Sequence, residues 1–179
     1  MDEYKRRELL DEAYRLGFEY EKTYKGCAQC TIAALQDCLD AREDPVFRAA
    51  SGLSGGCGLT IEGPCGGFTG GALVIGQLCG RERSDFLDRP GRRHRAYDAV
   101  EQLVRAFQQE FGSIVCREVQ GGVFGRSYRL RDPEEFSAFE ADGAHESKCP
   151  DVVGRAARLA LSIILEAGLA PGRGPGGGG

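Results

Sequence analysis

Apolar residues recur at steps of three and four along most of the chain, a spacing that predicts helices rather than strands. The clearest example ends at Phe111, where Gly112 stops it. Its apolar positions are Tyr97, Val100, Leu103, Val104, Phe107 and Phe111. No segment shows a convincing strand-like alternation, and no internal repeat is evident. The sequence therefore predicts an all-α protein.

The same periodicity, together with capping residues, predicts the remaining helices. They are expected over 2–24, 27–39, 45–53 and 65–79, over a short segment from Ser113 to Gly121, from Asp132 onward, and from about Pro150 to Gly168. Asp132 is a good capping residue, and Pro133 suits a first helical turn. We expect one compact helical domain over 1–170 and a flexible Gly-rich tail over 171–179.

A Gly-rich loop precedes the central predicted helix. Residues 52–71 contain nine glycines, which indicates a tight loop followed by a helix that packs at very close range. Within that helix, Gly66, Gly67, Gly70 and Gly71 repeat at a spacing of four and form a glycine strip. One side of the helix is therefore free of side chains, so a neighbouring helix or a cofactor can approach it.

Composition narrows the classes of function. Apolar residues make up 41% and charged residues 28%, as in ordinary globular proteins. The net charge of −4 argues against nucleic-acid binding. The sequence has no 18-residue apolar run and begins without the apolar region of a secretory signal, so we expect a cytoplasmic protein with no membrane insertion. The arginine-rich stretch 81–95 is expected to be a solvated loop and helix start, with anion binding as the alternative.

Eight cysteines carry the candidate chemistry. Their share lies below the roughly 8–10% of disulfide scaffolds, and the cytosol keeps thiols reduced. Metal binding or thiol catalysis is therefore favoured over structural disulfides. His94 and His145 are both expected at the surface, which leaves few residues for a histidine-based catalytic site.

Helix geometry sorts these cysteines. Cys27 and Cys38 would lie roughly 16 Å apart on one helix, and Cys65 and Cys79 roughly 21 Å apart on another, so neither pair can share one small site. One member of each pair is expected to be a buried spectator.

Four cysteines fall at or beside predicted helix N-termini, where the helix dipole and free N–H groups favour thiolate. They are Cys27, Cys65, Cys116 and Cys149. Cys38 and Cys79 lie at the C-terminal ends of predicted helices, where the helix dipole disfavours thiolate. Cys30 completes a CxxC motif with Cys27, and Cys57 lies in the Gly-rich loop, so both are candidates for an accessory role.

The cysteine pattern resembles the redox-active family named C_GCAxxG_C_C, which is related to the non-cytochrome part of split-Soret cytochrome c. The resemblance covers about 26–165 and rests on Gly26-Cys27, on Cys65-Gly66-Gly67-Phe68-Thr69-Gly70, on the segment 111–118 around Cys116, and on Lys148-Cys149. Gly67 replaces the family's alanine, and four of the eight cysteines are surplus to the pattern. The haem-attachment motif is absent, so no covalent haem is expected.

The resemblance implies redox activity and an iron–sulfur site. We expect a cluster of unspecified type held by Cys27, Cys65, Cys116 and Cys149, serving electron transfer or redox sensing with a redox partner protein. One alternative is a metal-free thiol–disulfide oxidoreductase, in which Cys27 or Cys65 attacks and Cys30 or another nearby cysteine resolves the mixed disulfide. A structural zinc site with four cysteine ligands is the second alternative.

Assembly is also suggested by the resemblance, because split-Soret relatives are dimeric. We expect a homodimer whose two-fold partner occupies the glycine strip. The alternative is that the chain's own last helix fills the strip, since it carries similarly small residues. These are Gly154, Ala156, Ala157 and Ala160.

Overall fold

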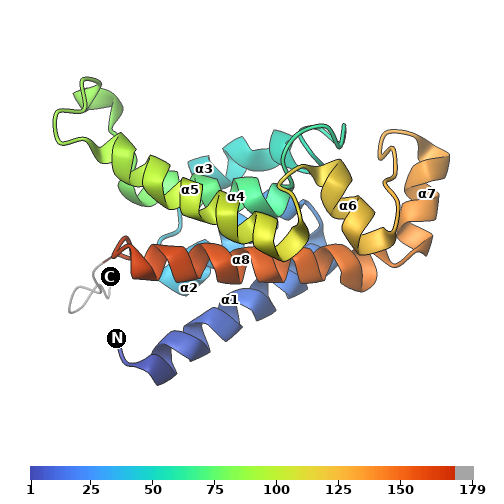
Figure 1. Cartoon of the computed structure of the whole chain (residues 1–179), viewed down its shortest axis with the longest axis horizontal. Helices are drawn as coiled ribbons and strands as arrows, with labels where there is room; N and C mark the ends of the chain where they lie inside the picture. Colours follow the sequence, from blue (N-terminus) through green and yellow to red (C-terminus); the bar gives the residue numbers. More distant parts are fainter. Residues whose placement is uncertain (172–179) are drawn as a thin grey trace.

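The computed structural model describes residues 1–171, which fold into eight α-helices without a β-strand (Figure 1). The helices are α1 (Glu3–Tyr24), α2 (Cys27–Leu39), α3 (Asp44–Ala49), α4 (Gly66–Cys79), α5 (Arg92–Phe111), α6 (Cys116–Phe124), α7 (Pro133–Ala141) and α8 (Cys149–Glu166). The prediction of an all-α, single-domain protein is confirmed. The tail predicted over 171–179 lies, apart from Pro171, outside the described residues.

The helices differ from the sequence-based expectation at three places. The helix predicted over 45–53 is α3 followed by a 3-10 turn, Ala50–Leu53. Helix α6 begins at Cys116 and continues through Gly121, because its stop is Gly125, whose φ of 78° ends the helix. A π-helical turn, Ala144–Lys148, leads directly into α8 and was not predicted, since hydrophobic periodicity carries no signal for it.

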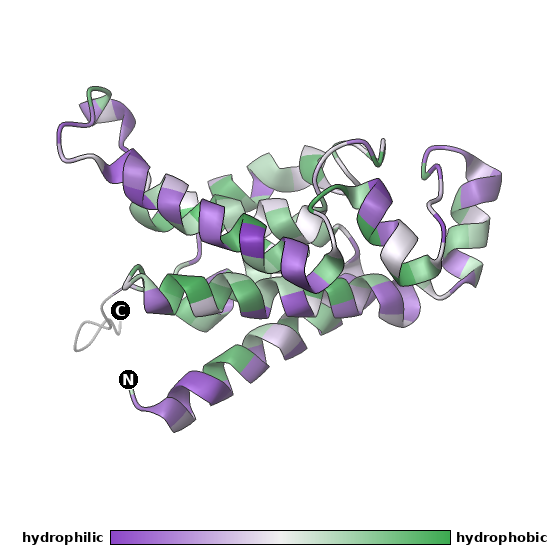
Figure 2. Ribbon diagram, in the orientation of Figure 1, coloured by the Kyte–Doolittle hydropathy of each residue, from purple (hydrophilic) through white to green (hydrophobic). Residues whose placement is uncertain are grey.

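Helix α8 lies at the centre of the molecule and contacts α1, α2, α4 and α5 (Figure 1). Much of α8 is apolar, whereas the outer parts of α1 and α5 are polar (Figure 2). Close contact with α1 is possible because small residues face each other: a Cβ on Gly17 would lie 3.1 Å from Gly154 Cα. Burial of this apolar helix supplies much of the hydrophobic stabilisation of the fold.

The glycine strip of α4 is filled from within the chain. A Cβ added at Gly67 would lie 2.9 Å from Ala156 Cβ, and one at Gly71 would lie 2.9 Å from Ala160 Cβ, both in α8. A Cβ on either of the other two glycines of the strip would lie 2.5 to 2.7 Å from the backbone of Ala28 in α2. The expectation that a partner chain occupies this strip is therefore wrong, because α2 and α8 already lie against it. A homodimer as such stays a prediction.

The arginine-rich stretch forms an arm that projects from the start of α5 (Figure 1). Its buried Asp88 accepts hydrogen bonds from the backbone N–H groups of Arg92 and Arg93, at 2.8 and 3.1 Å. These free donors of the helix start are thus already satisfied by a carboxylate of the chain, which favours the solvated-loop interpretation over anion binding. Among the helices of residues 1–171, none is both long and apolar enough to span a membrane.

Candidate functional site

Four cysteines from distant parts of the sequence line one cavity of about 60 Å³. Cys27 is the first residue of α2, Cys65 immediately precedes α4, Cys116 is the first residue of α6, and Cys149 is the first residue of α8. They are the four residues expected as ligands from helix position and family resemblance. The fold therefore brings four helix starts together around a single space.

Backbone contacts hold these helix starts in place. The N–H of Cys65 donates to Ile114 O at 2.7 Å, and the N–H of Cys116 donates to Gly63 O at 2.9 Å, which ties the start of α4 to the start of α6. Gly66 allows α2 to approach, since a Cβ there would collide with the Cys27 sulfur. Main-chain packing thus fixes the positions of Cys27, Cys65 and Cys116.

A left-handed loop closes one side of the cavity. Five consecutive residues, 55–59, have φ between 59° and 69°, and Ile61 has 62°. Three of the residues with positive φ carry side chains, Cys57, Leu59 and Ile61, and each such residue costs roughly 1–2 kcal/mol. Gly56 is required at its place, because a Cβ there would lie 2.8 Å from Cys116 Cβ. The strained loop therefore allows the backbone to pack directly against the site.

The remaining walls of the cavity are mostly apolar and come from α6, α7, α8 and the α6–α7 connection. They are Val119, Val123, Phe124, Leu130, Phe139, Val152 and Val153, with Gln120 as a polar exception. The volume is several times that needed to hold one water molecule. Such surroundings exclude bulk solvent and strengthen electrostatic interactions at the sulfur atoms.

Hydrogen-bond donors point at three of the sulfurs. Cys65 accepts from the backbone N–H groups of Gly67 and Phe68 in the first turn of α4, and Cys27 accepts from the N–H of Gly55, in each case lowering the pKa of the thiol. The side-chain amide of Gln120 lies 3.9 Å from Cys116 Sγ. These donors favour negative charge on sulfur.

Burial nevertheless outweighs these donors in the metal-free protein. It raises the pKa of Cys27, Cys65 and Cys116 to about 12, and it raises the pKa of Cys149 well above the ordinary value. Neighbouring negative groups, including the other cavity thiols, add to the increase. The N–H groups act on Cys27 and Cys65 in the expected direction, but in the metal-free state desolvation penalises thiolate more than they stabilise it, so the pKa of these thiols is raised.

Sequence analysis missed two titratable residues beside the cavity. Glu21 is 2% exposed, and its Oε2 has no hydrogen-bond partner among residues 1–171. Its charge helps to raise the pKa of Cys27 and Cys149. His145, expected at the surface, is largely buried, with Nδ1 2.8 Å from Glu140 and Nε2 3.7 Å from Glu21. The signal for Glu21 was its place four residues after Gly17 on the buried face of α1.

The other four cysteines lie outside the cavity in the described part of the chain. Cys38 and Cys79 are at the C-terminal ends of α2 and α4, as expected of spectators. Cys30 lies one turn after Cys27, and its thiol donates to Lys25 O at 3.2 Å. Cys57 is half-buried in the left-handed loop, near enough to Cys116 to affect its pKa. All eight thiols are free.

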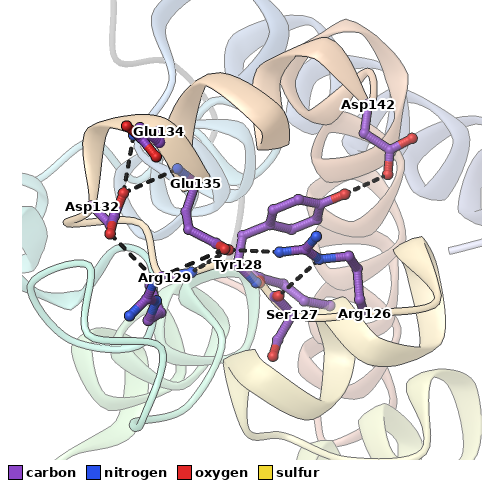
Figure 3. A network of polar contacts seen from close by, with 9 residues as sticks. Arg126, Ser127, Tyr128, Arg129, Asp132, Glu134, Glu135 and Asp142 are labelled. Atoms are coloured by element: carbon purple, nitrogen blue, oxygen red, sulfur yellow. Dashed lines mark hydrogen bonds and ion pairs between the residues drawn. The ribbon is translucent and has the colours of Figure 1, made fainter.

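The α6–α7 connection contributes Leu130 to the cavity wall and is held by a polar network (Figure 3). Asp132 caps α7 by accepting from the N–H groups of Glu134 and Glu135, while Arg126 pairs with Glu135 at 2.7 Å. The hydroxyl of Tyr128 donates to Asp142 at 2.9 Å. On the inner side, the Tyr128 ring packs in a small core with Cys116, Leu130 and Phe139.

The four thiols surround the cavity, but no three Cys, His, Asp or Glu side chains within residues 1–171 are grouped closely enough to hold one metal ion. Fold and cavity together define an all-helical protein with a buried four-cysteine site.

A comparison with protein-family models gives the family. The model described as "Putative redox-active protein (C_GCAxxG_C_C)" matches residues 25–163, about three-quarters of the chain, and the chain belongs to this family. The matched region contains all four cavity cysteines. Searches of curated proteins and of solved structures each returned no match.

Proposed function

We propose that the protein binds an iron–sulfur cluster through Cys27, Cys65, Cys116 and Cys149 and uses it for electron transfer or redox sensing. One observation carries the proposal: four thiols, each from a different helix start, line a single apolar cavity. Membership of a redox-active family supports it independently.

The donor set fits an iron–sulfur cluster chemically. Thiolates are the soft ligands that such clusters prefer, and coordination deprotonates a thiol outright. The raised pKa of each cavity thiol means that thiolate here needs a positive partner, which the irons would supply. Once bound, the cluster would supply one-electron transfer.

The chain's own residues would set the properties of the site. Apolar walls from α6 and α8 keep water away, and the N–H groups of Gly55, Gly67 and Phe68 direct positive dipoles at sulfur. Solvent exclusion and N–H···S bonds are the main ways by which a protein tunes the reduction potential of a cluster.

The thiol–disulfide alternative is less well supported. It needs a thiolate at neutral pH, whereas burial raises the pKa of both candidate nucleophiles, Cys27 and Cys65, to about 12. Cys30, the resolving residue of the CxxC motif, also lies outside the cavity. A structural zinc ion is also less well matched, because all four sulfur atoms would have to lie about 2.3 Å from one zinc ion. The thiols instead line a cavity of about 60 Å³.

Anaerobic purification followed by metal analysis tests the proposal. We expect brown protein containing iron and acid-labile sulfide in comparable amounts. A colourless, iron-free preparation that also resists reconstitution would contradict it. A single tightly bound zinc would favour the structural site. A metal-free protein with a reversible two-electron couple and one rapidly alkylated cysteine would favour the thiol–disulfide enzyme.

A further inference from the structure

A second and larger cavity opens on the other side of α2. This cleft has a volume of about 500 Å³ and lies between the end of α1, the outer face of α2 and the segment that includes α3. Its size falls within the roughly 300–1,000 Å³ range of small-molecule sites. Of the described residues, none lines both this cleft and the four-cysteine cavity.

Aromatic rings line the cleft and stand out into solvent. Tyr24 is 74% exposed and Phe47 is 37% exposed, and the Tyr20 ring lies 6.1 Å from the Tyr24 ring. Exposed rings gathered around a hollow give up little conformational freedom on binding and offer flat surfaces for stacking. This arrangement favours a flat ligand.

The charged groups of the cleft are paired within the chain. Arg42 pairs with Asp44 at 2.8 Å, the Tyr20 hydroxyl donates to Asp37 at 2.7 Å, and Lys25 pairs with Glu140 at 2.7 Å. The two cations and two carboxylates of the lining also cancel in charge. A phosphate or a quaternary ammonium group would have to displace these partners, so the cleft favours a neutral ligand.

Cys30 connects the cleft with the proposed redox site. It lines the cleft, whereas Cys27 lines the four-cysteine cavity, and the two are three residues apart in the first turn of α2. Their separation along the helix axis is therefore roughly 4.5 Å. A ring in contact with Cys30 would therefore lie about one turn of α2 from Cys27.

We propose that this cleft binds a neutral, flat, conjugated ring of the kind found in flavins and quinones. The aromatic surfaces indicate a flat ligand, and the paired charges indicate a neutral one. Neither inference depends on the four-cysteine site. Only the choice of a redox-active ring rests on the proposed function, through the short separation from Cys27.

Equilibrium dialysis with lumiflavin, a neutral isoalloxazine, tests the site. We expect saturable binding at one site per chain in both the iron-free and the iron-containing protein, so a failure of the cluster proposal does not affect this result. Loss of the two rings in the double variant Tyr24→Ala/Phe47→Ala should weaken binding by roughly tenfold or more. The single variant Tyr24→Ala, at a more exposed position, should show a smaller loss with the fold intact.

The chain offers a matched control. Tyr4 lies on the same helix as Tyr24 and is equally exposed, at 73%, but is remote from the cleft, so Tyr4→Ala should bind lumiflavin normally. Duroquinone as competitor separates a quinone from a flavin preference, and displacement by either ring at the same site supports the proposal. No saturable binding of either ring, unchanged binding in the double variant, or much tighter binding of flavin mononucleotide, which adds a phosphate, would overturn it.

Discussion

Glu21 is an acidic residue that burial holds far from its ordinary chemistry. Burial raises its pKa to about 7, and its position beside the four cavity thiols adds a fifth acidic group to the site. The native state therefore holds this proton more tightly than the unfolded chain does. By linkage, the resulting stabilisation is complete below the ordinary pKa of a glutamate and is lost as the pH rises through about 7.

For the metal-free protein, we predict that the free energy of unfolding falls as the pH rises from about 4.5 to 7. At about 1.4 kcal/mol per unit of pKa shift, the loss due to Glu21 is at most about 3–4 kcal/mol. Glu21→Gln should flatten this slope, because the amide has no proton to lose. Urea unfolding at several pH values measures it, with Glu8→Gln, an exposed position on the same helix, as control. An unchanged slope in Glu21→Gln would show that another group causes it.

At the scale of helices, most of the fold was predictable from the sequence. The periodic apolar faces, the Asp132-Pro133 start and the glycine stops indicated the number and type of the helices. The π-helical turn was not predictable, because hydrophobic periodicity carries no signal for it. The end of α6 was misplaced because Gly121, Gly122 and Gly125 are all possible stops, and the sequence does not say which of them takes a positive φ. The glycine strip was recognised as a close-approach surface, but the sequence could not say that α2 and α8 of the same chain fill it.

Two glycines of α4 give a matched test of this packing. Gly71→Ala would bring a methyl group to 2.9 Å from Ala160 Cβ, so we expect a loss of about 1–3 kcal/mol in stability from overpacking. Gly76 lies on the exposed side with nothing within 4 Å, so Gly76→Ala should stabilise by about 0.5–1 kcal/mol through helix propensity. Chemical denaturation measures both. Equal effects of the two changes would contradict close packing of α4 against α8.

Removal of the N-cap of α7 tests whether this helix shields the cavity thiols from solvent. Asp132→Ala removes two hydrogen bonds to the backbone and should cost about 1 kcal/mol. Because α7 contributes Phe139 to the cavity wall, we also expect faster alkylation of Cys116 in the metal-free variant through local opening. Asp2→Ala removes the analogous cap of α1, far from the site, and should leave this rate unchanged. Similar acceleration in both variants would mean that alkylation follows global unfolding.

At the scale of the whole molecule, the fold brings together cysteines that lie far apart in the sequence. Helix position and family pattern selected Cys27, Cys65, Cys116 and Cys149, and the structure places all four around one cavity. The sequence could not show that Cys30 would lie outside this cavity, on the cleft, since a CxxC spacing fixes only the separation along a helix. It also gave no sign that burial would dominate the pKa of these thiols, because desolvation depends on the finished tertiary structure.

Iron content across the eight single Cys→Ser variants, purified anaerobically, tests the central claim most directly. We predict that substitution of Cys27, Cys65, Cys116 or Cys149 lowers iron and acid-labile sulfide to a small fraction of the wild-type amount. Substitution of Cys30, Cys38, Cys57 or Cys79, which lie outside the cavity, should leave both near the wild-type level. Full iron content in any one of the four cavity variants, with the fold intact by circular dichroism, would contradict a site built from these four thiols.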